Sequence, residues 1–169
     1  MKRNEAAESV RTRPIEKADY MTVSRIYREE VKGYLTSLRK ARRDQELREE
    51  RRSIRPNLLR GEFEFYQKVG CSFVAVSRNK IIGFILTQPI SWMNMDSRVL
   101  WLEYIAVSPA FRDRGVGSAL MASARKWAAR RSISCRFATL NPDNKASRAL
   151  LRKGGFEVRK WLTARYPSS

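Results

Sequence analysis

The chain has 169 residues, and 35 Lys and Arg against 17 Asp and Glu give it a net charge of +18 with no histidine. The absence of His excludes imidazole bases, nucleophile relays and metal ligands, and two cysteines are too few for a disulfide framework or a Cys-only zinc site. No apolar run approaches the roughly 20 residues of a membrane span, and the polar start lacks the apolar core of a signal peptide. We therefore expect one cytoplasmic domain over residues 1–169 with no bound metal.

The positive charge is concentrated towards the C-terminus. Residues 112–169 hold 14 Lys and Arg against 3 Asp and Glu, so most of the net charge belongs to the last third of the chain. Such an excess favours an anionic partner. On charge alone, nucleic acid and a phosphorylated cofactor fit equally well.

The first part of the chain predicts one strand and two helices. Residues 9–14 alternate in polarity and end at a proline, which is typical of a short strand. Asp19 is a suitable N-cap, and apolar residues recur at helical spacing over 21–34. Residues 36–60 are dense in helix formers of mixed charge and predict a solvent-exposed helix that a proline and a glycine end.

The rest of the chain alternates strands with helices. Residues 71–78, 80–90 and 99–107 are rich in β-branched and aromatic side chains and predict three neighbouring strands. The elements expected after them are a helix over 115–131, a strand over 133–140, a helix over 144–153 and a last strand over 156–166. The alternation in 133–140 favours a buried position for Cys135.

A loop with two glycines joins the strand 99–107 to the next helix. Gly115 and Gly117 open that helix, so backbone N–H groups and the positive end of the helix dipole converge at one spot. Arg112 and Arg114 add fixed positive charge, which suits a pyrophosphate better than a single phosphate. Neither a P-loop nor a dinucleotide-binding fingerprint is present, so the segment predicts a phosphate cradle of another kind.

Two segments resemble motifs of the Gcn5-related N-acetyltransferases (GNAT). Residues 105–117, IAVSPAFRDRGVG, are similar to motif A, and residues 141–156, NPDNKASRALLRKGGF, are similar to a later block that ends in Gly-Phe. The resemblance also extends over the N-terminal strand and helices. It implies an α/β fold of the α+β type, with a mixed, mostly antiparallel sheet of about six strands, flanked by about four helices and splayed at the acetyl-CoA-binding strand.

The resemblance also implies which residues hold coenzyme A. Backbone groups of Ile105 and Val107 would pair with the pantetheine amides, and an N–H near Ile105 would polarise the thioester carbonyl. Asn144 would contact the pantetheine or a bound water, although a plain helix N-cap also explains this residue. The further positions expected to bind the cofactor are Ala106, Arg112, Asp113, Arg114, Gly115, Val116, Gly117 and Ser118.

Glu103 is the best candidate for the catalytic base. It lies two residues before the carbonyl-polarising position on the same strand, and acidic residues there often serve this role in the family, usually through a water. A base is needed because the attacking amine must be neutral. A Glu paired with one of the many arginines on a sheet face is the alternative.

The proton donor is where the sequence departs from the family. The motif's tyrosine, commonly the donor to the coenzyme A sulfur, falls at position 151, which is Leu151 here. Three outcomes stay open: Tyr104 or Tyr166 substitutes for it, water protonates the thiolate, or activity is weak or absent.

The end of the chain differs as well. Only one strand, 156–166, follows the Gly-Phe pair, where the family usually has a hairpin of two. An exposed sheet edge invites pairing with another chain. We expect a homodimer built around this strand.

The resemblance implies an enzyme that transfers an acetyl group from acetyl-CoA to a primary amine by direct attack in a ternary complex. A protein N-terminus or lysine, a polyamine and a small amine all remain candidate acceptors. For a cationic acceptor, the sequence offers Glu29, Glu30, Glu62 and Glu64 as an acidic pocket.

Two other functions compete with catalysis. A basic nucleic-acid or ribosome-binding module could use the same scaffold, with residues 36–60 as a basic helix. That segment interleaves carboxylates with its arginines, and no aromatic residue lies between Tyr34 and Phe63 to stack a base, so we do not favour it. A catalytically silent acyl-CoA sensor is the other alternative, and Leu151 favours it.

Overall fold

The computed structural model describes residues 10–39, 54–91, 98–133, 135–138, 140 and 144–157. They belong to two compact units, Met1–Thr139 and Leu140–Ser169, each of which is described by itself. The larger unit holds a five-stranded sheet and three of the four α-helices among these residues, and the smaller unit holds the fourth.

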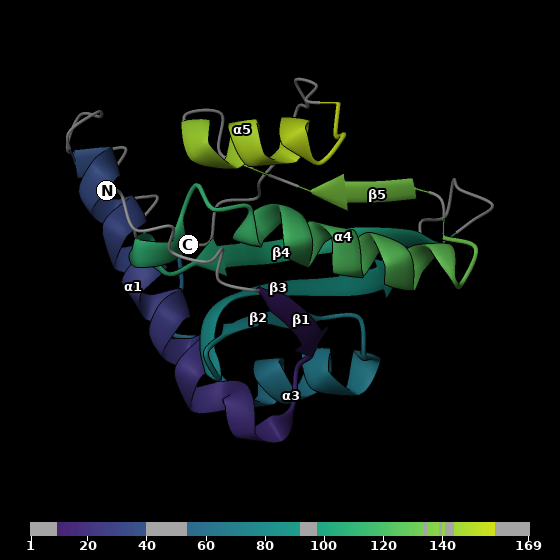
Figure 1. Cartoon of the computed structure of the whole chain (residues 1–169), viewed down its shortest axis with the longest axis horizontal. Helices are drawn as coiled ribbons and strands as arrows, with labels where there is room; N and C mark the ends of the chain where they lie inside the picture. The colour runs from purple at the N-terminus through teal and green to yellow at the C-terminus, as the bar shows by residue number, and fades with distance from the viewer. Residues whose placement is uncertain are drawn as a thin grey trace, which may run out of the picture. The chain divides into compact units, whose positions relative to one another are not determined.

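The sheet follows the chain order (Figure 1). Its strands are β1 (Arg11–Pro14), β2 (Phe73–Ser77), β3 (Lys80–Ile90), β4 (Val99–Val107) and β5 (Cys135–Ala138). The first three pairings are antiparallel, and β4 pairs with β5 in parallel. Four of these strands are nearly continuous apolar runs, as expected for a sheet covered on both faces.

Helices α1 (Tyr20–Arg39) and α3 (Arg60–Val69) cover one face of the sheet. Their buried side chains share a core with alternate residues of the strands. The members from the helices are Val23, Ile26, Phe63 and Tyr66, and those from the strands are Val74, Val76, Phe84, Leu86 and Ala106.

Helix α4 (Val116–Ala129) covers the opposite face. Thr12 is the register partner of Ala75, whose side chain points away from those of Val74 and Val76. The Thr12 hydroxyl lies 2.7 Å from the Ser123 hydroxyl of α4. Helix α4 therefore packs on the face of the sheet opposite to α1 and α3.

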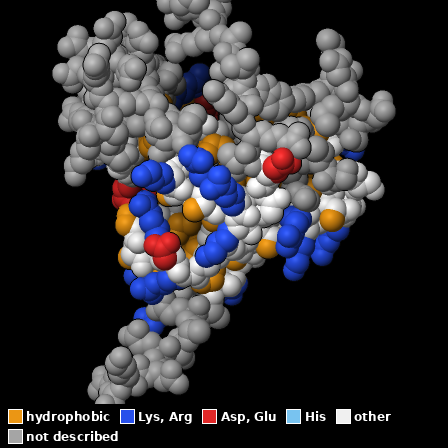
Figure 2. All heavy atoms as spheres, turned by 90° about the horizontal axis from the view of Figure 1, so that it is seen from above, with side chains coloured by type: hydrophobic (Ala, Val, Ile, Leu, Met, Phe, Trp, Pro, Cys, Tyr) orange, Lys and Arg blue, Asp and Glu red, His pale blue; other side chains and the backbone are white. Residues whose placement is uncertain are grey.

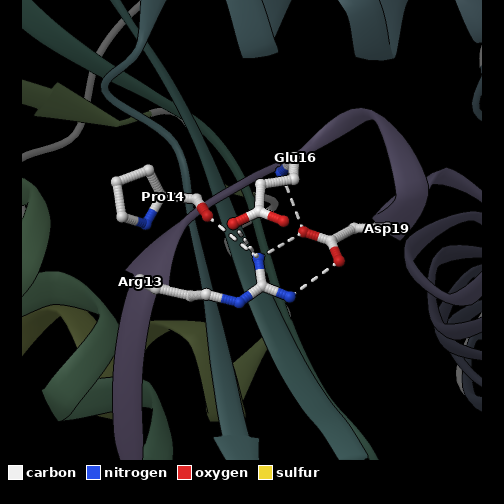
Figure 3. Close-up of polar contacts among 4 residues, drawn as sticks. All are labelled: Arg13, Pro14, Glu16 and Asp19. Carbon is white, nitrogen blue, oxygen red and sulfur yellow. Dashed lines mark hydrogen bonds and ion pairs between the residues drawn. The ribbon is translucent and has the colours of Figure 1, made fainter.

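An ion pair fixes the entry into α1 (Figure 3). The Arg13 guanidinium donates to both carboxylate oxygens of Asp19, at 2.6 and 2.8 Å, and Asp19 also accepts the Glu16 N–H at 2.8 Å. Asp19 was expected to be the N-cap of α1. Its carboxylate instead caps the preceding 3-10 turn, Lys17–Asp19. Its hydrogen bond is the main reason that the pKa of Arg13 is raised.

The prediction of one helix over 36–60 is wrong at its C-terminal end. Residues 54–59 are not helical, and α3 begins at Arg60, where the helix was expected to end. The reason is local, because the Glu62 carboxylate accepts the Leu59 N–H at 3.0 Å and closes the first turn of a new helix there. Residues 40–53 lie outside the described part of the chain.

The predicted mixed, mostly antiparallel α/β architecture is confirmed. The strand expected over 156–166 lies almost wholly outside the described residues, so the homodimer built on it stays a prediction. Within the described ranges, no helix combines the length and apolar character needed to cross a membrane.

In the smaller unit, α5 (Lys145–Lys153) begins after Asn144 and ends at a pair of glycines. Gly155 has a φ of +81°, a conformation that few residues other than Gly adopt readily. The turn it permits brings the Phe156 N–H to the Leu151 carbonyl at 3.0 Å, which closes the helix.

Candidate active site

The loop between β4 and α4 has the geometry of an anion cradle. Asp113 and Gly115 have φ values of +60° and +79°, and Gly115 is the N-cap of α4. A Cβ at Gly115 would meet nothing within 4 Å, so the space beside this backbone is open. The N–H groups of 116–118 lie in the first turn, where amides have no helical carbonyl to bond to and can bind an anion.

Beside this loop, β4 is longer than its parallel partner. β5 pairs with Val99–Leu102 only, whereas the pairing of β4 with β3 continues to Val107. Among the described residues, the segment 103–107 therefore has a strand on one side and none on the other. The splay expected of the acetyl-CoA-binding strand corresponds to this free edge.

A β-bulge interrupts β4 at Glu103. Leu86 pairs with Tyr104 and Thr87 pairs with Leu102, so Glu103 is an extra residue without a partner on β3. Leu86 and Gln88 share the α1–α3 face, and the Gln88 amide lies 3.4 Å from the Glu103 carboxylate. Glu103 and Tyr104, although consecutive, therefore lie on the same face, a redirection that bulges often produce near active sites.

Glu103 is exposed, and no arginine pairs with it among the described residues. Both interpretations of Glu103, as a base and as a paired carboxylate, stay predictions. Burial raises the pKa of Tyr66 above its usual value, and the charge of Glu103 raises it further. The Tyr66 phenol on this face is therefore neutral at ordinary pH.

The Tyr104 ring is packed between aromatic neighbours from α1 and β3. Its centroid lies 4.6 Å from that of Tyr27 and 6.0 Å from that of Phe84. Burial raises the pKa of Tyr104, and the nearby Tyr27 and Glu30 add to the shift. The phenol thus stays protonated, which suits a proton donor and not a base.

Arg112 is engaged by two other elements. Its Nη2 donates to the Glu30 carboxylate of α1, and its Nε donates to the Val107 carbonyl at 3.1 Å. Arg114 lies over the Phe111 ring at 5.8 Å and is exposed, as are Asp113 and Ser118. Arg114 therefore points a charge into solvent beside the cradle, whereas the charge of Arg112 is partly neutralised.

The expected acidic acceptor pocket is occupied by ion pairs. Glu29 pairs with Arg25 at 3.0 Å, Glu62 pairs with Arg55, and Glu30 pairs with Arg112. An acceptor would have to displace an arginine to use any of these three carboxylates.

Two further candidates lie near or beyond the C-terminal helix. The Asn144 Oδ1 accepts the Ser147 N–H at 3.0 Å, so this residue is the N-cap of α5, and a contact with pantetheine stays a prediction. Leu151 is buried. Tyr166 lies outside the described residues, as do the side chains of Cys135 and its neighbours.

Among the described residues visible in Figure 2, Lys and Arg side chains outnumber those of Asp and Glu. The described residues contain no group of three His, Cys, Asp or Glu side chains that could hold a metal ion.

The family of this chain follows from a direct match. A model of the acetyltransferase (GNAT) family matches residues 27–156, most of the chain. The protein therefore belongs to the GNAT acetyltransferase family. No curated protein matches the sequence at a significant level.

Solved structures confirm the fold. The aminoglycoside N-acetyltransferase AAC(6')-Iy in complex with CoA has 21% sequence identity and a TM-score of 0.63, with 96% of this chain and 97% of that chain covered. Wild-type TTHA1254 from Thermus thermophilus has 19% identity and a TM-score of 0.66, with 94% and 98% covered. The acetyltransferase meta-AAC0020 from an uncultured soil metagenomic sample, in complex with sisomicin, has 12% identity and a TM-score of 0.62, with 95% and 96% covered.

Proposed function

We propose that the protein is an N-acetyltransferase that moves an acetyl group from acetyl-CoA to a primary amine. The observation that carries this proposal is the β4 edge at 103–107, which no described strand covers, directly before the anion cradle of α4. One element pairs with an extended amide chain and the next binds a pyrophosphate, which is the order of these groups in coenzyme A. The CoA complex of AAC(6')-Iy supports this donor.

On the donor side, the edge of β4 pairs with the pantetheine arm through Ile105 and Val107. The first-turn amides of Val116, Gly117 and Ser118 hold the pyrophosphate, and Arg114 adds a charge-assisted contact. Arg112 does so only after it leaves Glu30. The N–H near Ile105 polarises the thioester carbonyl.

On the acceptor side, Glu103 takes the proton from the ammonium form of the substrate, directly or through a water. The neutral nitrogen attacks the thioester carbon, the new C–N bond forms, and the C–S bond breaks. The nitrogen loses its second proton to water. The coenzyme A thiolate gains a proton from water, directly or through Tyr104, which water then reprotonates. Leu151 excludes a phenol at the position that commonly supplies it in the family.

The acceptor is a small or peptide-borne primary amine. The solved relatives include AAC(6')-Iy with a bisubstrate analogue of CoA and an acetylneamine, and an aminoglycoside acetyltransferase with sisomicin. Sisomicin is therefore the first acceptor to test, followed by spermidine and a peptide with a free N-terminus and a lysine. The protein acts in the cytoplasm, and its homodimer forms through residues 156–166.

The test is calorimetry with acetyl-CoA, followed by a free-thiol assay over these acceptors. Binding with amine-dependent thiol release supports the proposal. Binding without release over the whole panel contradicts it and favours an acyl-CoA sensor. No binding of acetyl-CoA, together with salt-dependent binding of RNA, would favour the nucleic-acid module.

A further inference from the structure

The Tyr66 hydroxyl has no hydrogen-bond partner among the described residues. The residue is 9% exposed and belongs to the core that α1 and α3 form with the sheet. Its hydroxyl makes no hydrogen bond with any described residue. The described residues also contain no fully buried polar side-chain atom that lacks a partner, so the Tyr66 oxygen is reachable from outside although its ring is not.

Because this oxygen is reachable from outside, a water or a bound ligand can make its hydrogen bond. The neighbouring tyrosines show the usual solution. The hydroxyl of Tyr20 donates to the Leu58 carbonyl at 3.2 Å, and that of Tyr27 donates to the Arg55 carbonyl at 3.2 Å. Both phenols thus hydrogen-bond α1 to the segment before α3. The phenol of Tyr66 makes no such bond to a described residue.

Glu103 lies on the same face of the sheet as Tyr66. The bulge redirects Glu103 to the α1–α3 face, where its carboxylate lies 3.4 Å from the Gln88 amide. After burial, the charge of Glu103 is the strongest influence that raises the pKa of the Tyr66 phenol. A carboxylate from β4 and a neutral hydroxyl from α3 thus lie on the same face of the sheet.

We propose that the Tyr66 hydroxyl binds the acceptor amine together with Glu103 and is a catalytic residue of the transfer. This inference rests on the proposed function. A neutral primary amine has two N–H groups and one lone pair. When Glu103, which has taken the ammonium proton, accepts one N–H at its carbonyl oxygen and the Tyr66 oxygen accepts the other, the lone pair is left to face the thioester carbon. Tyr66 gains and loses no proton in this step, and its raised pKa keeps the hydroxyl neutral.

The test compares Tyr66→Phe with Tyr20→Phe, which remove the same atom from two helices. Tyr66→Phe removes a hydroxyl that bonds to no described residue, so the urea midpoint and the Kd of acetyl-CoA stay unchanged. The kcat/KM for the best acceptor among sisomicin, spermidine and the peptide falls about tenfold to a hundredfold. Tyr20→Phe loses the bond to Leu58, so its urea midpoint falls while its kcat/KM stays unchanged.

Three outcomes overturn the inference. A kcat/KM for the amine that is unchanged in Tyr66→Phe shows that the hydroxyl does not touch the acceptor, and it leaves the proposed function intact. A loss in kcat/KM that matches a fall in the urea midpoint shows a structural role for the hydroxyl. Binding of acetyl-CoA by the unaltered chain without transfer to any acceptor contradicts the proposed function, and this inference with it.

Discussion

Arg112 and Glu30 join the loop before α4 to the middle of α1. The guanidinium donates to the Glu30 carboxylate and, through Nε, to the Val107 carbonyl at the end of β4. Arg112 is one of the two arginines expected at the pyrophosphate. In the structure, a carboxylate from the opposite face of the sheet competes for its charge.

Replacement of Glu30 by Gln should tighten acetyl-CoA binding, because it removes that competitor. An exposed ion pair contributes up to about 1 kcal/mol, so we expect the Kd to fall about two- to fivefold by calorimetry. Glu29→Gln is the matched control, since Glu29 pairs with Arg25 on its own helix. An equal fall in the Kd of acetyl-CoA in both variants would mean that only the net charge of the chain determines the effect.

Glu103→Gln should abolish most of the acetyl transfer and leave acetyl-CoA binding unchanged. Loss of a general base costs about a hundredfold or more in turnover, and it should change the pH profile of the transfer. Steady-state kinetics over a range of pH measure both effects. Glu64→Gln on α3 is the control, and a normal profile in Glu103→Gln would show that the base lies elsewhere.

Asp19→Ala should destabilise the fold more than any change at Glu16. The Asp19 side chain is 5% exposed, and its loss leaves the Arg13 guanidinium and the Glu16 N–H without their acceptor. We expect a cost of about 2–4 kcal/mol in the free energy of unfolding by urea. Glu16→Gln removes only a 3.7 Å ion pair with Arg13 and should cost under about 0.5 kcal/mol.

Gly→Ala substitution should lower the stability of the fold at Gly83 and raise it at Gly33. A Cβ at Gly83 would lie 2.8 Å from the Ala106 carbonyl oxygen, so Gly83→Ala forces β3 and β4 apart and destabilises the fold. Gly33 lies within α1 with nothing within 4 Å of an added Cβ, so Gly33→Ala should stabilise by about 0.5–1 kcal/mol. Thermal unfolding measures both, and destabilisation by Gly33→Ala would contradict the described course of α1.

Stability should decline above about pH 10, the usual pKa of a tyrosine. Burial raises the pKa of Tyr104 in the folded chain above its usual value of 10.0. The unfolded chain therefore loses the phenol proton first as the pH rises. The contribution of Tyr104 to the free energy of unfolding is complete below pH 10.0 and is lost at higher pH. Urea unfolding at pH 9 and pH 11 should therefore show a smaller loss in Tyr104→Phe than in the unaltered chain. An equal loss in the two proteins would contradict the burial of this phenol.

The sequence predicts the sheet and the start of α4 after the glycine loop well, because their signals are local. The run 99–107 is apolar and β-branched, and the glycines at 115 and 117 stand where a helix begins. The boundary near 60 was wrong because a carboxylate three residues later, Glu62, starts a helix at a place where Pro56 and Gly61 suggested an end.

Other parts of the site have no local signal. Nothing in VLWLEYIAV marks a bulge, since it arises from the register with β3 and redirects Glu103 without any glycine. The Glu30–Arg112 pair joins residues 82 positions apart. The position of Tyr66 on the face that carries Glu103 follows from the start of α3 at Arg60 and its packing on the sheet, neither of which the local sequence indicates.

The difference in length between β4 and β5 also gives the donor site a direct reporter. Of the amides in 103–107, those that point away from β3 have no strand to bond to among the described residues. An extended amide chain that binds there adds a strand and slows their exchange with deuterated solvent, while the amides of Val99–Leu102, already paired with β5, change little. Amide hydrogen exchange along β4 thus reports acetyl-CoA binding separately from catalysis, and it needs no acceptor.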